Sequence, residues 1–156
     1  MNTTRLSLEE IYNLAFSSLT KNGCDEYNAE AVSTTVTHAE RDGSVSHGLF
    51  RIPGYVASLK SKKVKCDARP SNTFLTQNVI RVDGDYGFAP TAIKVGIPSL
   101  VETTNKHGVG VLTITNTHHF AALWHETEAL AENDLIGIAC TAYKPSVAPA
   151  GAKKPL

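Results

Sequence analysis

The chain has 156 residues, of which 42% are hydrophobic and 19% charged, as in one folded domain or part of a larger one, and unlike a disordered chain. Basic and acidic residues number 15 each, which leaves no excess positive charge for a nucleic-acid surface, and no apolar run reaches the roughly 18 residues of a membrane span. Its cysteines, far apart and without a CxxC pair, indicate reduced thiols, so we expect a cytoplasmic protein with neither nucleic acid nor membrane as partner.

Helix signals dominate the first part of the chain. Ser7 and Glu10 have the spacing of a capping box, the apolar residues that follow recur at helical intervals, and Gly23 is a natural stop. Asp25 can cap a second helix that ends near Asp42. A third, shorter helix is expected around residues 55–59. We therefore predict a helical N-terminal segment over residues 1–70.

After residue 70 the pattern changes to an alternation of strands and helices. Such an alternation favours an α/β sheet. We take residues 71–156 as a second unit. The expected strands are 79–82, 108–115 and 135–142, and the expected helices are 92–106 and 121–133.

Gly108-Val109-Gly110 suggests a dinucleotide-binding fingerprint, but two features exclude an ordinary Rossmann site. The third glycine of that motif should stand at position 113, which is Thr113. The glycines also precede the expected strand, whereas the motif follows its strand.

The stretch from Asp42 to Arg51, DGSVSHGLFR, brings together groups that can carry chemistry. If His47 begins the third helix, Arg51 lies one turn later on the same face. An imidazole can donate a proton near neutral pH, a guanidinium can hold a carboxylate, and the Ser46 hydroxyl can fix the imidazole tautomer or relay its proton. These groups suit a small 2-keto or 2-imino acid. The residues alone leave open a plain helix start with a surface arginine. A serine hydrolase is disfavoured because the GxSxG motif is absent.

The second candidate stretch, residues 116–120, lies between an expected strand and an expected helix. In an α/β sheet ligands bind at this junction, and the free N–H groups of the helix start suit a phosphate. The residues alone fit an ordinary helix cap equally well. A metal site from His118, His119 and His125 is disfavoured because adjacent histidines rarely point the same way, so we expect no metal.

Three segments resemble one family. AERDGSVSHGLFRIPGYVASLKSKKV looks like the N-terminal signature of the malate/L-lactate dehydrogenase family, the NAD(P)-dependent oxidoreductases that lack a Rossmann fold. TITNTHHFAALWHETEALAENDLIGIA is similar to the cofactor-binding stretch of that family. APAGAKKPL resembles the run that leads into its Phe-Gly-Thr-Asn-Pro motif. Within the family, the chain looks closest to the reductases of Δ1-piperideine-2-carboxylate and Δ1-pyrroline-2-carboxylate.

The resemblance implies roles for the matching residues. Ser46 would be the relay hydroxyl, His47 the proton donor, and Arg51 the ligand of the substrate carboxylate. The cofactor, NADPH or alternatively NADH, would be lined by His119, Phe120, Ala121, Ala122 and Leu123.

The resemblance also implies a fold and an activity. The fold would be an α/β fold with a mixed, largely antiparallel sheet and flanking helices, and residues 71–156 would form the first part of the cofactor-binding domain. The reaction would be the NADPH-dependent reduction of the cyclic 2-imino acids to pipecolate and proline. The alternatives are a malate-, lactate- or ureidoglycolate-type 2-hydroxy acid dehydrogenase and an inactive fragment with a structural role.

Family members are longer than this chain and form homodimers. The resemblance therefore implies an N-terminal half, which belongs to a dimeric enzyme or pairs with a chain that supplies the C-terminal half. We expect the isolated chain to be insoluble or held by a second chain, because unpaired strands and apolar faces would be exposed.

Overall fold

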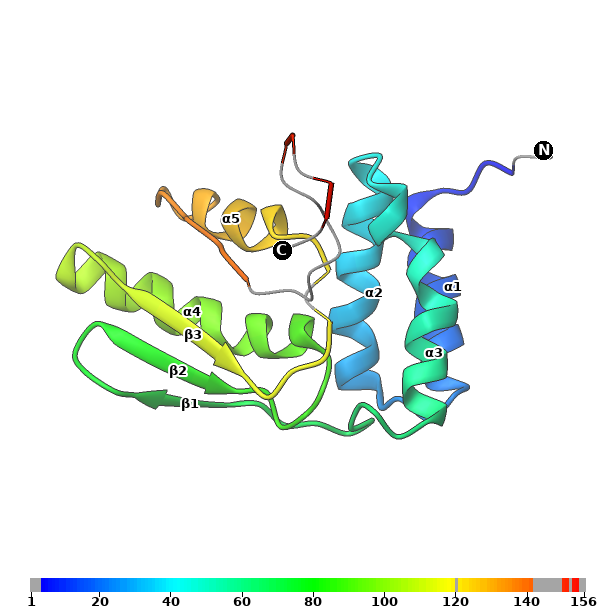
Figure 1. Ribbon diagram of the computed structural model, residues 1–156, viewed down its shortest axis with the longest axis horizontal. Coiled ribbons are helices and arrows are strands. Elements are labelled where there is room, and N and C mark those ends of the chain that lie inside the picture. The colour runs from blue at the N-terminus through cyan, green and yellow to red at the C-terminus, as the bar shows by residue number, and fades with distance from the viewer. Residues whose placement is uncertain (1–3, 120, 142–149, 152, 155–156) are drawn as a thin grey trace.

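The computed structural model describes residues 4–119, 121–141, 150–151 and 153–154 (Figure 1). The N-terminal part is helical, and a sheet with flanking helices follows it. The elements in chain order are α1 (Leu8–Thr20), α2 (Glu26–Arg41), the short 3-10 helices η1 (Val45–His47) and η2 (Leu49–Arg51), α3 (Ile52–Lys60), β1 (Ser71–Phe74), β2 (Val79–Asp83), α4 (Ala89–His107), β3 (Val111–Thr115) and α5 (Trp124–Ala131).

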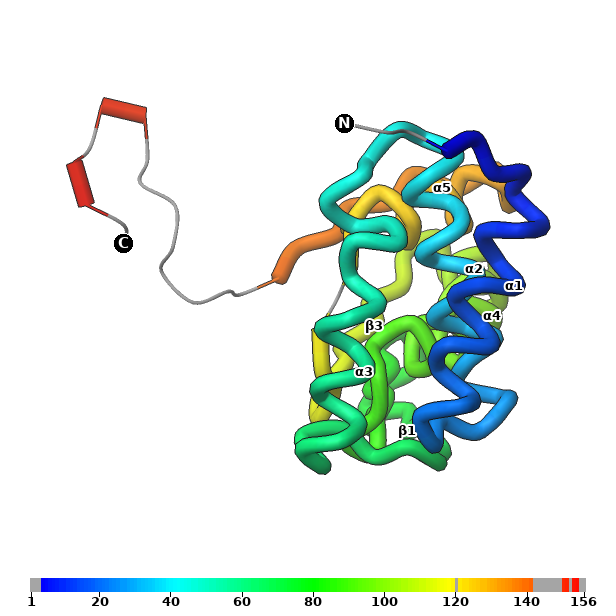
Figure 2. Tube along the Cα trace, turned by 90° about the vertical axis from the view of Figure 1, so that its right-hand side faces the viewer, coloured from blue at the N-terminus to red at the C-terminus, as the bar shows by residue number. Residues whose placement is uncertain are grey.

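Helices α1, α2 and α3 pack together beside the sheet (Figures 1 and 2). The predicted capping box of α1 is confirmed: the Ser7 side chain accepts from the Glu10 N–H, and the Glu10 carboxylate accepts from the Ser7 N–H at 2.7 Å. Asp25 caps α2 as predicted. The apolar faces so aligned bury one core, which comprises Ala15, Leu19, Cys24, Ala29, Val32, Val36, Ile52, Tyr55, Leu59, Val64 and Phe88.

The sheet is mixed. Strand β2 is central, antiparallel to β1 and parallel to β3. Helix α4 contacts all three of these strands, and Ile80 and Val82 are fully buried. Gly96 lets the helix approach closely, since a Cβ there would press against Leu112 and Val82. The expected α/β fold with a mixed sheet and flanking helices is confirmed.

Several expected element boundaries were displaced or missed. Strand β1 was not predicted, because SNTF has one apolar residue and no clear alternation. Strand β3 begins at Val111 because Gly108 ends α4 in the left-handed conformation, with φ of 81°. Gly110 lies against Leu100 and Thr104. The glycines of the rejected fingerprint thus end a helix and pack a strand. The boundary at residue 70 stays a prediction, although β1 begins at Ser71.

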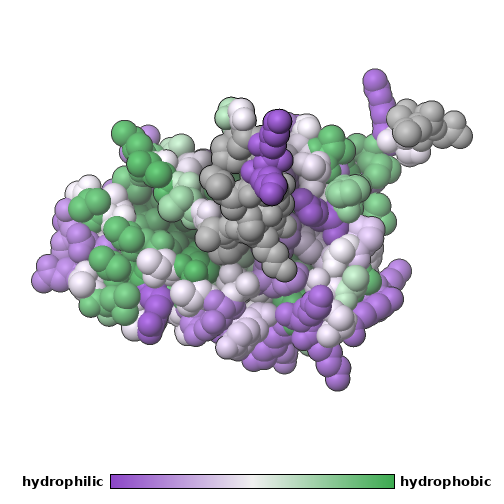
Figure 3. Space-filling model, in the orientation of Figure 1, coloured by the Kyte–Doolittle hydropathy of each residue, from purple (hydrophilic) through white to green (hydrophobic). Residues whose placement is uncertain are grey.

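The predicted strand over residues 135–142 is wrong for 135–141, and residue 142 lies outside the described part. The segment alternates between partly buried and exposed residues as a strand does, but it pairs with no strand among the residues that the structure describes. Ile136 and Ile138 are 99% and 93% exposed. Figure 3 shows hydrophobic side chains gathered on the half of the molecule that holds β3 and α5. What this segment lacks in the described part of the chain is a neighbouring strand, because an apolar segment becomes a β-strand only when it pairs with one.

Among the residues that the structure describes, no helix is both long and apolar enough to cross a bilayer.

Candidate active site

The segment after α2 forms two short 3-10 helices with Gly48 between them. His47 ends η1 and Arg51 ends η2, so the condition that His47 begins the third helix is not met, and the expected third helix is α3, which begins at Ile52. The reason is Gly48. The Glu40 carboxylate lies where a Cβ of residue 48 would stand, and it accepts the Leu49 N–H at 2.7 Å. Glu40 therefore pins the chain between His47 and Arg51.

The imidazole of His47 is held by hydroxyls on one side. Ser46 Oγ lies 2.9 Å from Nδ1 and Ser44 Oγ lies 3.3 Å from it. The predicted contact between Ser46 and His47 is therefore present. Both partners within the described residues meet Nδ1, so Nε2 is the nitrogen that can face a substrate. Partial burial, and secondarily the Arg51 charge, lowers the pKa of His47.

Arg51 is fixed through one edge of its guanidinium. Its Nε donates to the Ser46 carbonyl at 2.7 Å, which turns Arg51 back toward η1. Its charge contributes to lowering the pKa of both His47 and His119. The Arg51 charge is thus felt by two imidazoles that come from different parts of the chain.

His119 lies in the loop after β3 and faces α3. The Ala121 N–H donates to its Nδ1 at 3.1 Å, and Tyr55 Oη lies 3.1 Å from the same atom. An amide can only donate, so Nδ1 accepts and the proton sits on Nε2. Burial above all, helped by the Arg51 charge, lowers the pKa of His119 to about 4. His119 is therefore a neutral imidazole.

His118 takes a different partner. Its Nε2 lies 3.0 Å from Ser58 Oγ, one turn along α3 from Tyr55. Its backbone bonds to Gly87 and Ala89, which ties the loop to the start of α4. Within the part of the chain that the structure describes, His118, His119 and His125 form no common ligand set.

The expected cofactor stretch runs from His119 into α5. Phe120 lies outside the described residues. Ala122 is buried, and Ala121 is partly buried with a φ of 58°. Helix α5 begins after Leu123 without a side-chain cap. Small side chains and uncapped helix N–H groups fit the approach of a flat ring or an anionic group of a nucleotide.

Trp124 was missed by sequence reasoning and completes the arrangement. Its ring meets that of His47 edge-on, with centroids 6.1 Å apart, and its Nε1 donates to Asp42 Oδ2 at 2.9 Å. It is the one tryptophan of the chain, which was the available signal. Its contacts join α5 to the segment that carries His47, so the structure brings the two predicted stretches together.

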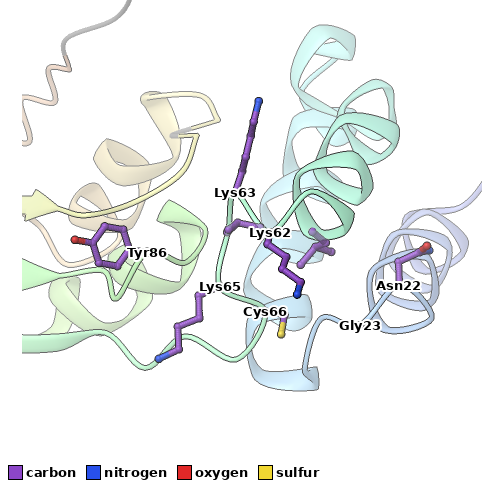
Figure 4. Close-up of a pocket in the computed structure, with 9 residues that line it drawn as sticks. Asn22, Gly23, Lys62, Lys63, Lys65, Cys66 and Tyr86 are labelled. Atoms are coloured by element: carbon purple, nitrogen blue, oxygen red, sulfur yellow. The ribbon is translucent and has the colours of Figure 1, made fainter.

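A cavity of about 630 Å³ lies elsewhere, beyond the C-terminal end of α3 (Figure 4). Its basic wall is partly neutralised, since Lys65 pairs with Asp85 at 2.6 Å. No predicted site residue lines it. The lining residues are Asn22, Gly23, Leu59, Lys62, Lys63, Val64, Lys65, Cys66 and Tyr86.

An imidazole, a guanidinium and the start of a helix without a side-chain cap thus belong to one mixed α/β fold. The model of the malate/L-lactate dehydrogenase family matches residues 6–156. The chain belongs to the malate/L-lactate dehydrogenase family. The resemblance found in the sequence is thereby confirmed.

Curated relatives match nearly the whole chain. It is 38% identical over 152 residues to the Δ1-pyrroline-2-carboxylate/Δ1-piperideine-2-carboxylate reductase of Pseudomonas aeruginosa, over 97% of this chain and 46% of that protein. It is 40% identical over 152 residues to the Δ1-pyrroline-2-carboxylate reductase of Ancylobacter novellus, over 97% of this chain and 45% of that one. The chain spans about half the length of the curated relatives it matches.

Solved structures of the family share the fold. The Δ1-piperideine-2-carboxylate reductase of Pseudomonas syringae superposes with a TM-score of 0.80 at 36% identity, over 83% of this chain and 39% of that one. The malate dehydrogenase of Entamoeba histolytica superposes with a TM-score of 0.78 at 27% identity, over 85% of this chain and 37% of that one. A Δ1-piperideine-2-carboxylate reductase and a malate dehydrogenase thus share the fold of this chain over the matched part.

Proposed function

We propose that this chain is the N-terminal part of a reductase that converts Δ1-piperideine-2-carboxylate and Δ1-pyrroline-2-carboxylate to pipecolate and proline with NADPH. The contacts of Ser46 carry the proposal: its hydroxyl lies 2.9 Å from His47 Nδ1 and its carbonyl accepts from Arg51 Nε at 2.7 Å, so a proton donor and a carboxylate ligand would act side by side. The 38% identity to a reductase that bears these substrates in its name supports the choice of imino acids.

Arg51 would bind the substrate carboxylate. Its Nε is used by the Ser46 carbonyl, and the other guanidinium edge carries the donors that match a carboxylate. The bound acid then lies beside His47. His47 would give its proton to the imine nitrogen, and the lowered pKa makes its protonated form a stronger acid. Ser46, at Nδ1, would steady the ring and relay the replacement proton.

NADPH would supply the hydride that reduces C2 of the imine. Backbone and small side chains of His119, Ala121, Ala122 and Leu123 would hold its nicotinamide end, with Phe120 belonging to the same run of sequence. Neutral His119 adds no second positive charge beside Arg51. NADH would fit the same backbone contacts, so the 2′-phosphate would be read by residues outside this group.

The C-terminal half of such an enzyme would complete the site. Support comes from the relatives' length and from the exposed Ile136 and Ile138, which offer an apolar surface to a further segment. That half would come from the same chain in a cytoplasmic homodimeric enzyme or from a separate chain.

A chimera tests the proposal directly. The matched N-terminal half of the Pseudomonas aeruginosa reductase is replaced by this chain, and NADPH oxidation is measured with Δ1-piperideine-2-carboxylate, Δ1-pyrroline-2-carboxylate, pyruvate and oxaloacetate. We expect higher kcat/KM with the imino acids. Preference for pyruvate or oxaloacetate would instead establish a 2-hydroxy acid dehydrogenase. A folded chimera with no activity toward any of them would leave a structural fragment as the correct description.

A further inference from the structure

A group of possible metal ligands lies where α5 meets the end of α2. His38 stands in the last turn of α2, and His125 and Glu128 stand one turn apart on α5. Their ligand atoms all lie within 4.8 Å of one another. Sequence reasoning had considered His125 only with His118 and His119, which the structure places against α3.

The distances among the three side chains fit tetrahedral coordination of one ion better than a direct hydrogen bond between the two histidines. The Nδ1 atoms of His38 and His125 are 3.4 Å apart, longer than the roughly 2.9 Å of an ordinary hydrogen bond. Zinc–nitrogen bonds of about 2.0–2.1 Å at the tetrahedral angle put two ligand nitrogens roughly 3.4 Å apart. The rings meet edge-on at 72°, and the contact between them is made by Nδ1 of each ring. Glu128 Oε2 lies 4.0 Å from His38 Nδ1, within a small side-chain movement of the third position.

The surroundings orient the ligands and set the charge. Glu128 turns its other oxygen, Oε1, to Arg41 at 2.7 Å, which leaves Oε2 facing the histidines. Arg41 also pairs with Asp42, so two carboxylates outweigh one guanidinium around the group. Burial, helped by the His38 charge, lowers the pKa of His125 and favours the neutral ring that a metal requires.

We propose that His38, His125 and Glu128 bind one divalent transition-metal ion, with Zn²⁺ as the best match to two imidazoles and a carboxylate. The ion joins α5 to α2. It thereby holds Trp124, the neighbour of His125, against His47 and Asp42. The site is separate from Ser46, His47 and Arg51 and would act as a structural link.

The test is titration of the chelator-treated chimera described above with Zn²⁺ by calorimetry, with Co²⁺ absorption as the report on tetrahedral geometry. We expect one ion per chain, and at least tenfold weaker binding in each of His38→Ala, His125→Ala and Glu128→Gln. His107→Ala is the matched control, an exposed histidine at the end of α4. Cys66→Ser and Cys140→Ser remove the exposed thiols as alternative ligands.

A second measurement covers variants that fold poorly. Zn²⁺ should raise the Tm of the chimera by preferential binding to the folded state, and at the same Zn²⁺ concentration should raise the Tm of its Glu128→Gln variant less. Binding of equal strength in the parent chimera and all three ligand variants, or binding lost only with the thiols, would overturn the proposal. So would a parent chimera that takes up no ion, in which case His38 and His125 form a plain contact between rings.

Discussion

At the scale of single residues, His119 shows how the surroundings of a histidine set its tautomer and its protonation state. The Ala121 amide requires Nδ1 to accept, and burial keeps the ring neutral. The sequence predicted His119 as part of a cofactor stretch, but it gave no sign of Tyr55, which lies 64 residues away in the chain and reaches the same nitrogen. Contacts of this range follow from packing, which local spacing does not encode.

The titration of His119 is the first prediction at this scale. Its pKa, lowered to about 4 against an ordinary 6.5, means that the unfolded chain binds the proton more readily. Stability that is present above pH 6.5 should therefore fall as the pH drops from 6.5 toward 4. Histidine NMR should give a midpoint near 4, and His119→Gln should reduce the loss of Tm in this window. A midpoint at or above 6.5 would contradict the burial and the tautomer.

Arg51→Lys tests the carboxylate ligand. Lysine keeps the charge but loses the planar pair of donors, so the chimera should show a KM for the imino acids raised about 10- to 100-fold, with kcat changed much less. Arg69→Lys is the matched control, an exposed arginine paired with Asp25 far from the site. Equal effects of the two variants would remove Arg51 from substrate binding.

At the scale of elements, signals confined to a few residues were sufficient for α1 and α2. The capping side chains of Ser7, Glu10 and Asp25 bond to backbone groups only three residues away. Strand β1 was not predicted and a strand over residues 135–141 was predicted wrongly, and both errors have the same cause. The polar stretch of β1 is a strand because it pairs with β2, whereas the apolar run from residue 135 pairs with no strand in the described part of the chain. Strand formation depends on a partner that may lie anywhere in the fold.

Gly48 carries the element-scale prediction. A methyl group there meets the Glu40 carboxylate, so Gly48→Ala should displace Glu40 from the Leu49 N–H and cost about 1–3 kcal/mol. Gly54 on α3 has open space around it, and Gly54→Ala should instead stabilise the chain by about 0.5–1 kcal/mol. Urea unfolding of both variants measures the contrast. Equal free energies of unfolding would show that Glu40 does not pin the loop.

At the scale of the molecule, the candidate site combines two segments that are far apart in the sequence, one after α2 and one after β3. Trp124 on α5 reaches Asp42 and His47, and His119 after β3 reaches Tyr55 on α3. The family could be recognised from the sequence because its motifs are local stretches. The way in which these stretches meet required the fold.

The exposed apolar surface gives the prediction at this scale. Ile136 and Ile138 are almost fully exposed, so the isolated chain should associate at rising concentration or precipitate. Ile136→Lys with Ile138→Lys should reduce association, measured by light scattering after size-exclusion chromatography. Phe50→Lys, 72% exposed beside the His47 loop, is the matched control and should reduce it less. A wild-type chain that stays monomeric and melts cooperatively would refute this.

The turnover of the chimera with His47→Ala tests the central claim most directly. A positioned acid contributes about 10²- to 10⁴-fold to a rate, so kcat for Δ1-piperideine-2-carboxylate should fall by that order while KM changes little. Folding of the variant is checked by its Tm against the parent chimera. Near-normal kcat across neutral pH in a folded His47→Ala chimera would contradict the assignment of His47 as the proton donor.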